Sequence, residues 1–542
     1  MPLDVAGQTD RESDPLLEPL LTPKDPAEGV ALHRDDGDEN GESFDDVPHA
    51  KRQLGIASAS FLIFNRVIGT GIFATPSVIL RSSGSVGVAM LMWLLGAVVA
   101  AAGTSVFIEL GTGLPRSGGE KNYLEYIYRR PKFLATCIYA TYSMLIGSSS
   151  ANSIVFGEYV LHALDITPSQ WNARFIAVAC LTFVFILHGT FLTAGLRLQN
   201  GLGFFKLLVL LTIAVFGVFH LAGVPGFAVR DGYEVSHNLR WSEMWEGSGT
   251  GANAFVESLY NVIWSFIGYS NANYALSEIR DPVRTIKRAA PAAMVSVTVV
   301  YMFVNVAYFA VVSKSDILGS GRIIAALFFR NLFGPIAERI LSTIIALSTL
   351  GNILAVLFSQ GRVVQELGRE GIIPYSSFFA SNKPFNAPLP GLFWQWLFSA
   401  LYVMAPPPGD AYLFMLNMSS YPHAIINTFV SGGLLFLYTP WCRKWEWNPP
   451  FRAPKLLVAF FFASNIFLIF VPLIPPLPGT ELYDFLPYWS HVFVAVSISL
   501  FGVVYWYIWS VWLPRRNGYV LVRQLVRQDD GISRSVFRKV AA

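Results

Sequence analysis

Long apolar runs separated by short polar connections fill the chain from about residue 54 to residue 513. Most runs exceed the roughly 20 residues that an α-helix needs to cross the hydrocarbon core of a bilayer. They predict twelve helices, at 54–80, 86–111, 133–162, 173–193, 198–221, 254–278, 291–313, 333–360, 389–405, 410–439, 455–474 and 485–513. The pattern therefore predicts an all-α transmembrane protein with the lipid bilayer as its surroundings.

The composition agrees with this fold class. Hydrophobic residues make up 53% of the 542 residues and charged residues only 14%, whereas soluble domains carry about 25% charged residues. The mean hydropathy is +0.47. The sequence has no metal-ligand spacing, phosphate-binding glycine loop or nucleophile–base–acid set. We therefore expect no enzyme activity, no cofactor and no metal site.

The N-terminal segment 1–50 differs from the rest of the chain, because it holds 14 acidic residues against Arg11, Lys24 and Arg34. Such a segment has little to bury, and we expect a disordered acidic tail. The stretch 12–17 fits an acidic dileucine sorting pattern, and 35–39 is an acidic run that could dock trafficking adaptors. The alternatives are a chance match and a solvated charge run.

Basic residues of the remaining chain, which has a net charge of +14, gather in alternate connections. The largest groups lie at 51–52, 116–132, 280–288, 443–444 and 515–516. The positive-inside rule places these connections and both termini in the cytosol, so the charge does not indicate nucleic-acid binding. Arg81 and Lys314 are a minority on the other side. We expect a transporter domain at 51–515 and a cytosolic C-terminal tail at 516–542.

The first span contains a candidate site of unwinding at mid-membrane, where Gly69 and Gly71 flank Thr70. In lipid every backbone N–H and C=O must be satisfied internally, so a glycine cluster is costly unless it lines a polar cavity. Freed N–H groups at the start of a following half-helix form an anion site suited to a carboxylate. The alternative is close helix packing through small residues.

The sixth span has a comparable feature at Gly268, which precedes the polar run 269–271. Unwinding here would free carbonyls that can accept the donors of an ammonium group. The two breaks open two successive five-helix units, at 54–221 and 254–439, which the helices of 455–513 follow. Interrupted helices at equivalent places in two repeats indicate a substrate site at the midplane. An N–H cradle and a carbonyl cradle together suit a zwitterion, hence an α-amino acid.

Several motifs resemble those of a known superfamily. They are IGTGIF at 68–73, ELGT at 109–112, SGG at 117–119 and EIRDP at 278–282. In order and spacing they are similar to the signatures of the amino acid–polyamine–organocation superfamily. Within its L-type branch the chain is most similar to fungal high-affinity methionine permeases, through GGEKNYLEY at 118–126, FGEY at 156–159, HGT at 188–190 and GLRLQN at 195–200.

The resemblance implies a LeuT-type fold, with a 5+5 inverted repeat, broken helices 1 and 6, two extra C-terminal helices and alternating access. It also implies a set of substrate-binding residues, namely Ile68, Gly69, Thr70, Gly71, Ser148, Asn152, Trp264, Ser265, Ile267, Gly268 and Asn427. The N–H groups of Thr70 and Gly71 would hold the carboxylate. Carbonyls of Trp264, Ser265 and Ile267 would hold the amine, and Trp264 would close over the substrate. Ser148, Asn152 and Asn427 would line the side-chain pocket, and Asn152 departs from the apolar residue usual in this branch.

Charged residues inside or beside spans are further candidates. Lys206 lies in an apolar run, where an ionisable residue is costly and therefore a functional candidate; snorkelling to the interface is the alternative. By resemblance, Lys206 would replace the cation of sodium-coupled relatives and tie span 5 to the break in span 1, and a proton-carrying role stays open. We expect Glu109 and Glu278 to pair with Arg or Lys as inner-gate contacts, or to form surface pairs of little consequence.

These features predict a secondary active permease that imports neutral L-amino acids, with methionine as the best candidate. Transport would be sodium-independent and coupled to protons, at the plasma membrane or alternatively the vacuole. The alternatives are an amino-acid exchanger, a non-transporting sensor and a polyamine carrier. Residues 163–172 contain no cysteine, so we expect no disulfide-linked partner subunit and three free thiols at Cys137, Cys180 and Cys442.

Overall fold

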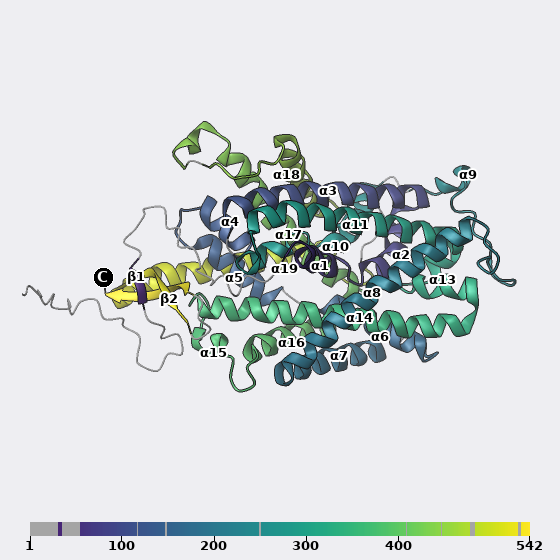
Figure 1. Ribbon diagram of the computed structural model, residues 1–542, viewed down its shortest axis with the longest axis horizontal. Helices are drawn as coiled ribbons and strands as arrows, with labels where there is room; N and C mark the ends of the chain where they lie inside the picture. Colours follow the sequence, from purple (N-terminus) through teal and green to yellow (C-terminus); the bar gives the residue numbers. More distant parts are fainter. Residues whose placement is uncertain are drawn as a thin grey trace, which may run out of the picture.

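The computed structural model describes residues 31–34, 55–115, 117–146, 149–167, 169–248, 251–407, 409–445, 447–476, 483–528 and 533–541. Long helices run roughly along the longest axis of the molecule (Figure 1). The expectation of a disordered N-terminal tail concerns residues that lie outside the described part, apart from the short strand β1 (Ala31–Arg34). The fold in this part of the chain is helical, as the apolar runs predict.

The first half of the chain contains α1 (Ile56–Val67), α2 (Gly71–Ser83), α3 (Val86–Gly113), α4 (Glu120–Ile127), α5 (Leu134–Leu145), α6 (Ser150–Ala163), α7 (Gln170–Thr190), α8 (Leu192–Leu221), α9 (Trp241–Met244), α10 (Ala252–Phe266) and the 3₁₀ helix η3 (Asn271–Glu278). The second half contains α11 (Pro282–Val311), α12 (Lys314–Gly319), α13 (Ile324–Phe333), α14 (Pro335–Arg369), α15 (Ser376–Ala380), α16 (Leu389–Met404), α17 (Ala411–Leu437), η4 (Pro440–Trp445), α18 (Lys455–Phe470), η5 (Val471–Leu473), α19 (Ser490–Trp506), the π-helical η6 (Tyr507–Trp512) and α20 (Leu513–Asn517).

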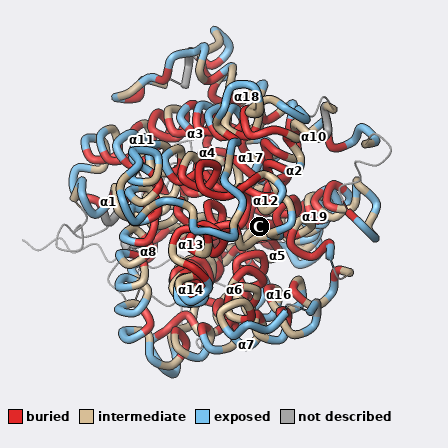
Figure 2. Tube along the Cα trace, turned by 90° about the vertical axis from the view of Figure 1, so that its right-hand side faces the viewer, coloured by how far each residue is buried: buried red, intermediate tan, exposed pale blue. Residues whose placement is uncertain are grey.

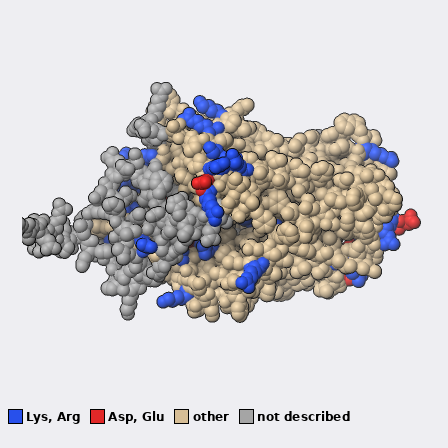
Figure 3. All heavy atoms as spheres, viewed as in Figure 1, with Lys and Arg blue, Asp and Glu red and all other residues tan. Residues whose placement is uncertain are grey.

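Seven of the described helical segments are long and apolar enough to cross a membrane, and α1 with α2 forms an eighth that is bent by 45°. The shorter apolar helices α13 and α16 add to these. On the face shown in Figure 3, a broad band between the two ends of the molecule has no charged side chains. The transmembrane part of the chain is therefore all-α, whereas the number of twelve spans stays a prediction.

Helix α8 illustrates how the sequence separates a lipid-facing side from a core-facing side. Phe204, Leu208, Leu211 and Val215 lie on one stripe at helical spacing and are exposed, whereas Lys206 is buried. Because lipid tails and not water surround this stripe in a bilayer, an exposed leucine avoids the free-energy cost of contact with water. The outer helices α7 and α8 accordingly show exposed turns, while buried residues gather toward the centre (Figure 2).

The predicted third span, 133–162, is not one helix. Helix α5 ends at Leu145 and α6 begins at Ser150. The sequence between them is Ile-Gly-Ser-Ser at 146–149. Glycine and serine are poor residues for a helix interior, because glycine has too much conformational freedom and serine competes for backbone hydrogen bonds. The backbone N–H of Ser149 donates to the hydroxyl of Ser399 in α16, at 3.1 Å.

The segment 116–130 contains the short helix α4. Tyr123, Tyr126 and Ile127 share its buried side. Glu120 and Lys121 are buried as well, so α4 is packed into the protein and does not lie along a membrane surface. This position brings its first residue close to the broken helices.

The C-terminal tail contains structure that the sequence analysis did not predict. Strands β2 (Tyr519–Arg527) and β3 (Ser533–Ala541) form an antiparallel hairpin, in which Tyr519 faces Ala541, and β1 pairs with the other edge of β2. Arg523 forms an ion pair with Glu125 of α4. The N–H of Phe537 donates to the carbonyl of Glu370 at 2.9 Å. The hairpin thus packs against α4 and the C-terminal end of α14.

Candidate functional site

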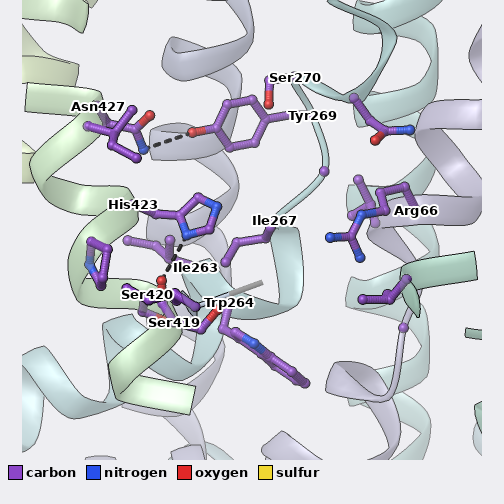
Figure 4. A pocket seen from close by; sticks show the side chains of 18 of the residues that line it. Arg66, Ile263, Trp264, Ile267, Tyr269, Ser270, Ser419, Ser420, His423 and Asn427 are labelled. Atoms are coloured by element: carbon purple, nitrogen blue, oxygen red, sulfur yellow. Dashed lines mark hydrogen bonds between the residues drawn. The ribbon is translucent and has the colours of Figure 1, made fainter. Parts of the chain in front are cut away.

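A cavity of about 190 Å³ lies where the first and the sixth predicted spans are both interrupted. Gly69 and Gly71 line it from the α1–α2 break, and Trp264, Ser265, Ile267 and Gly268 line it from the end of α10 and the segment that follows. Asn152 of α6 and Asn427 of α17 complete its walls together with residues of α4, α5 and α14. Figure 4 shows Asn427 and Arg66 on opposite sides of this space.

The first break exposes backbone donors. Helix α1 ends at Val67, Ile68 is extended (φ −72°, ψ 96°), and α2 begins at Gly71. The first N–H groups of a helix have no partner within it, and no acceptor among the described residues reaches the N–H groups of Gly69, Thr70 or Gly71. These donors, at the positive end of α2, make a site for an anion.

Both glycines of this break lie in close contact with neighbouring helices. A Cβ atom on Gly69 would lie 2.8 Å from the side-chain nitrogen of Asn352, and one on Gly71 would lie 2.4 Å from the hydroxyl and 3.0 Å from the Cα of Ser265. The amide of Asn352 is the end of a flexible side chain that can move aside, whereas the backbone of Ser265 cannot, so a larger residue at position 71 would separate the break from α10. The same hydroxyl of Ser265 lies 3.1 Å from that of Thr75.

The second break exposes acceptors. Helix α10 ends at Phe266, Ile267 is extended, and Gly268 has a φ of +127°, which residues with a side chain rarely adopt. The carbonyl of Trp264 accepts the N–H of Ile267 at 3.2 Å. No donor among the described residues reaches the carbonyl of Ile267. The segment therefore keeps acceptor capacity for a cationic group, as the predicted amine site needs.

One buried tyrosine joins the two breaks, and sequence reasoning did not identify it. The hydroxyl of Tyr301 in α11 lies 3.1 Å from the carbonyl of Val67 and 3.1 Å from that of Ser265. Its ring packs edge-on against Trp93 and in a tilted arrangement against Phe266. Tyr301 is completely buried. It therefore fixes the end of α1 relative to α10.

Lys206 is buried against the first break from the other side. Its ammonium donates to the carbonyls of Asn65, at 2.6 Å, and of Ile68, at 2.5 Å. Only 1% of the residue is exposed, so it does not snorkel to an interface. Lys206 ties α8 to the break, which is the geometry that the resemblance led us to expect. It lies behind the cavity wall and does not line the cavity.

The predicted side-chain pocket is partly assembled. The hydroxyl of Thr70 donates to the amide oxygen of Asn152 at 2.6 Å, which links α6 to the break. The amide of Asn427 donates to the hydroxyl of Tyr269 at 3.3 Å on the opposite wall. Ser148 lies outside the described residues. The structure thus brings Asn152 and Asn427 to one cavity, from opposite sides.

Two charged residues line the cavity that were not among the predicted site residues, Arg66 and Glu120. Glu120 accepts hydrogen bonds from the hydroxyls of Ser270, at 3.0 Å, and of Tyr274. Arg66, in the last turn of α1, points into the space in Figure 4. The available signal for Arg66 was its charge inside an apolar span, the same signal that identified Lys206.

Glu109, one of the two glutamates proposed as gate residues, is not among the residues that line this cavity. Glu109 is completely buried and accepts hydrogen bonds from the hydroxyl of Tyr438, the indole of Trp447 at 2.9 Å and the N–H of Ala453 at 2.7 Å. The expected arginine or lysine partner is wrong for Glu109 in the described part of the chain. A buried carboxylate needs donors, and neutral ones from the α17–α18 connection supply them. The side chain of Glu278 lies outside the described part.

An aromatic and ionic stack lies beyond Trp264. The ring of Trp264 meets Tyr412 of α17 edge-on, with centroids 6.3 Å apart. The guanidinium of Arg322 lies 4.6 Å from the centre of the Tyr412 ring and donates to Glu158 of α6 at 2.8 Å. These residues separate the cavity from the end of the molecule that carries α12 and α13.

Comparison with known proteins places this site in context. A family model described as amino acid permease matches residues 54–498. The chain is 46% identical to the high-affinity methionine permease of Saccharomyces cerevisiae, over 93% of this chain and 87% of that protein. It is 30% identical to the low-affinity methionine permease of the same organism, over 90% and 88%. It is 25% identical to the mouse b(0,+)-type amino acid transporter 1, over 84% and 88%.

Proposed function

The chain belongs to the amino acid permease family, and from this premise we propose that it imports neutral L-amino acids, with methionine as its substrate, by alternating access. Family membership makes it an amino acid transporter and not an enzyme. The choice of methionine is supported by the 46% identity to a protein named a methionine permease. The observation that carries the mechanism is the cavity that lies between the two helix breaks.

The substrate would lie with its carboxylate at the N–H groups of Thr70 and Gly71, beside Ile68 and Gly69. Its ammonium would lie at the carbonyls of the second break, of which that of Ile267 has no donor among the described residues. This arrangement pairs both ends of a zwitterion with backbone groups, so it is independent of the side chain. Ser148, Asn152 and Asn427 would contact the side chain, and Trp264 would close the space above it.

The twelve-span arrangement is also a proposal, and the helix order supports it. The first repeat would consist of α1 with α2, α3, α5 with α6, α7 and α8. The second would consist of α10 with η3, α11, α14, α16 and α17, followed by α18 and α19. In this assignment the two interrupted helices open the two repeats, and they pack together, α2 against α10 and α1 against η3.

The orientation follows from the basic connections, which would place both termini in the cytosol. The cavity extends along Glu120 and Gln360 toward the end that carries the C-terminal hairpin. Its other end is covered by Trp264, Tyr412 and the ion pair of Arg322. The conformation would then be open to the cytosol and closed outside. The plasma membrane is our proposed location, with the vacuole as the alternative.

We propose proton coupling without sodium, because the ammonium of Lys206 would occupy the place of a cation beside the break. No adaptor or subunit is needed for this mechanism. The sorting signals at 12–17 and 35–39 would serve trafficking only. Cys137, Cys180 and Cys442 are buried and free, so none offers an exposed thiol for a disulfide-linked partner.

Of the alternatives, an exchanger would use the same site. A polyamine carrier needs acidic residues in the cavity. The one acidic residue among the described lining residues is Glu120, whose two oxygens both accept hydrogen bonds from hydroxyl groups. A polyamine would therefore have to displace these bonds. A sensor would bind substrate without accumulation.

The test is uptake of radiolabelled methionine into proteoliposomes, with and without an inward proton gradient. Saturable, gradient-driven accumulation that leucine inhibits and spermidine does not would support the proposal. Uptake that requires internal amino acid would indicate an exchanger. Binding without accumulation would indicate a sensor, and competition by spermidine alone would refute the amino-acid assignment.

A further inference from the structure

Arg66 is a cation in the wall of the cavity, and the proposed transport mechanism assigns no role to it. It lies in the last turn of α1, one residue before the helix ends, and is half-buried. No carboxylate or carbonyl among the described residues accepts a hydrogen bond from its guanidinium. Figure 4 shows the side chain directed into the space, across from Ile267 and His423. Its charge is therefore presented to whatever occupies the cavity.

The charges around the cavity do not balance. On the side of the first break, Arg66 adds to the ammonium of Lys206 and to the positive end of α2. The other titratable lining residues are tyrosines of α5, α10, the segment 267–270 and η3, and His423 of α17, whose Nδ1 lies 2.8 Å from the carbonyl of Ser419. Helix η3 packs against α1, so its tyrosine lies on the same side as Arg66. The compensating charge is Glu120, and hydroxyls of Ser270 and Tyr274 hold its oxygens.

From this imbalance we propose that Arg66 is a specificity-determining residue that excludes amino acids with a cationic side chain. The inference rests on the proposed function. Every amino acid carries one α-carboxylate that this positive charge attracts and one α-ammonium that it repels, so the charge does not discriminate among neutral substrates. A second positive charge on the side chain of lysine or ornithine is repelled. For like charges about 7 Å apart at an effective dielectric constant of about 20, the discrimination is roughly fiftyfold.

Desolvation of any charged side chain would also disfavour lysine, so the test must separate the sign of the charge from its presence. Lysine and 2-aminoadipate have side chains of similar length and opposite charge. In the wild-type protein, 2-aminoadipate should inhibit methionine uptake at a concentration at least tenfold lower than lysine. Desolvation alone predicts that the two inhibit about equally.

The matched variants are Arg66→Gln, Arg66→Lys and Arg515→Gln. Arg66→Gln should lower the inhibition constant of lysine at least tenfold and abolish the preference for 2-aminoadipate. Arg66→Lys keeps the charge and should keep the preference. Arg515→Gln removes an exposed cation of α20 and should behave as wild type. If lysine stays excluded by Arg66→Gln while methionine is still taken up, the proposal is wrong.

A variant that no longer transports is measured by binding instead. Stabilisation of the detergent-solubilised protein against heat by methionine, lysine or 2-aminoadipate ranks the three ligands without a transport cycle. If Arg66→Gln does not fold, the comparison of the two charged analogues in wild type decides, and equal inhibition overturns the proposal. Failure of the wild-type protein to take up any neutral amino acid would refute the proposed function, and that result differs from unchanged selectivity.

Discussion

Replacement of Lys206 by methionine tests how α8 controls the break in α1. Methionine has a similar length, so the change removes the ammonium and leaves the packing. It also leaves the carbonyls of Asn65 and Ile68 without their donor, at a cost of about 1–3 kcal/mol each. Against this, the protein no longer has to bury an ammonium, which costs several kcal/mol. The two terms nearly cancel in global stability.

The substitution still affects the local conformation of the break, because the two hydrogen bonds hold the end of α1 in the conformation that exposes the N–H groups of Thr70 and Gly71. We therefore expect Lys206→Met to unfold within a few degrees of wild type but to lose at least tenfold in methionine uptake. The matched control is Leu208→Met, on the exposed side of the same helix, which should retain uptake. Uptake by Lys206→Met equal to that of Leu208→Met would refute the role of this tether.

Three other substitutions test the remaining contacts of the site. Tyr301→Phe removes one hydroxyl shared by two carbonyls and should lower the stability against thermal unfolding by about 1–2 kcal/mol and weaken methionine binding; unchanged binding would contradict the bridging role. Gly268→Ala introduces a Cβ 2.8 Å from the Arg66 side chain at a φ of +127° and should reduce uptake at least tenfold, and wild-type uptake would show that the second break need not be strained. Glu158→Gln neutralises the partner of Arg322; it should change the maximal uptake rate while equilibrium binding of methionine stays within about twofold, and an equal loss of both would place Glu158 in binding rather than closure.

The sequence by itself determined where the first and the sixth predicted spans are interrupted. Gly71 and Gly268 are local signals, because a close approach that excludes a Cβ atom, or a backbone conformation with positive φ, favours glycine. The burial of Lys206 could also be predicted, since a lysine in an apolar run must find acceptors. These features depend on a few neighbouring residues and on the rule that lipid offers no hydrogen bonds.

The tertiary structure alone decided which distant groups meet at the breaks. Tyr301 shares its hydroxyl between residues 234 and 36 positions away, and Glu109 is held by donors more than 300 positions away. Neither the carbonyls that contact Tyr301 nor the donors to Glu109 can be recognised from the local hydrophobic periodicity of the sequence. The same holds for the entry of Glu120 into the cavity, which required α4 to be packed inward.

The C-terminal hairpin and the interruption between α5 and α6 are backbone features that could not be predicted from the sequence. Apolar and polar residues alternate only weakly in β2. The segment forms a strand because α4 and the end of α14 offer partners for Arg523 of β2 and for Phe537 of the paired strand β3. The serines after α5 are compatible with a helix or a break, and the hydroxyl of Ser399 selects the break. Local sequence thus determined which backbone segments could leave the helix, and long-range packing determined what they bind, because hydrogen-bond partners in a bilayer must come from the protein itself.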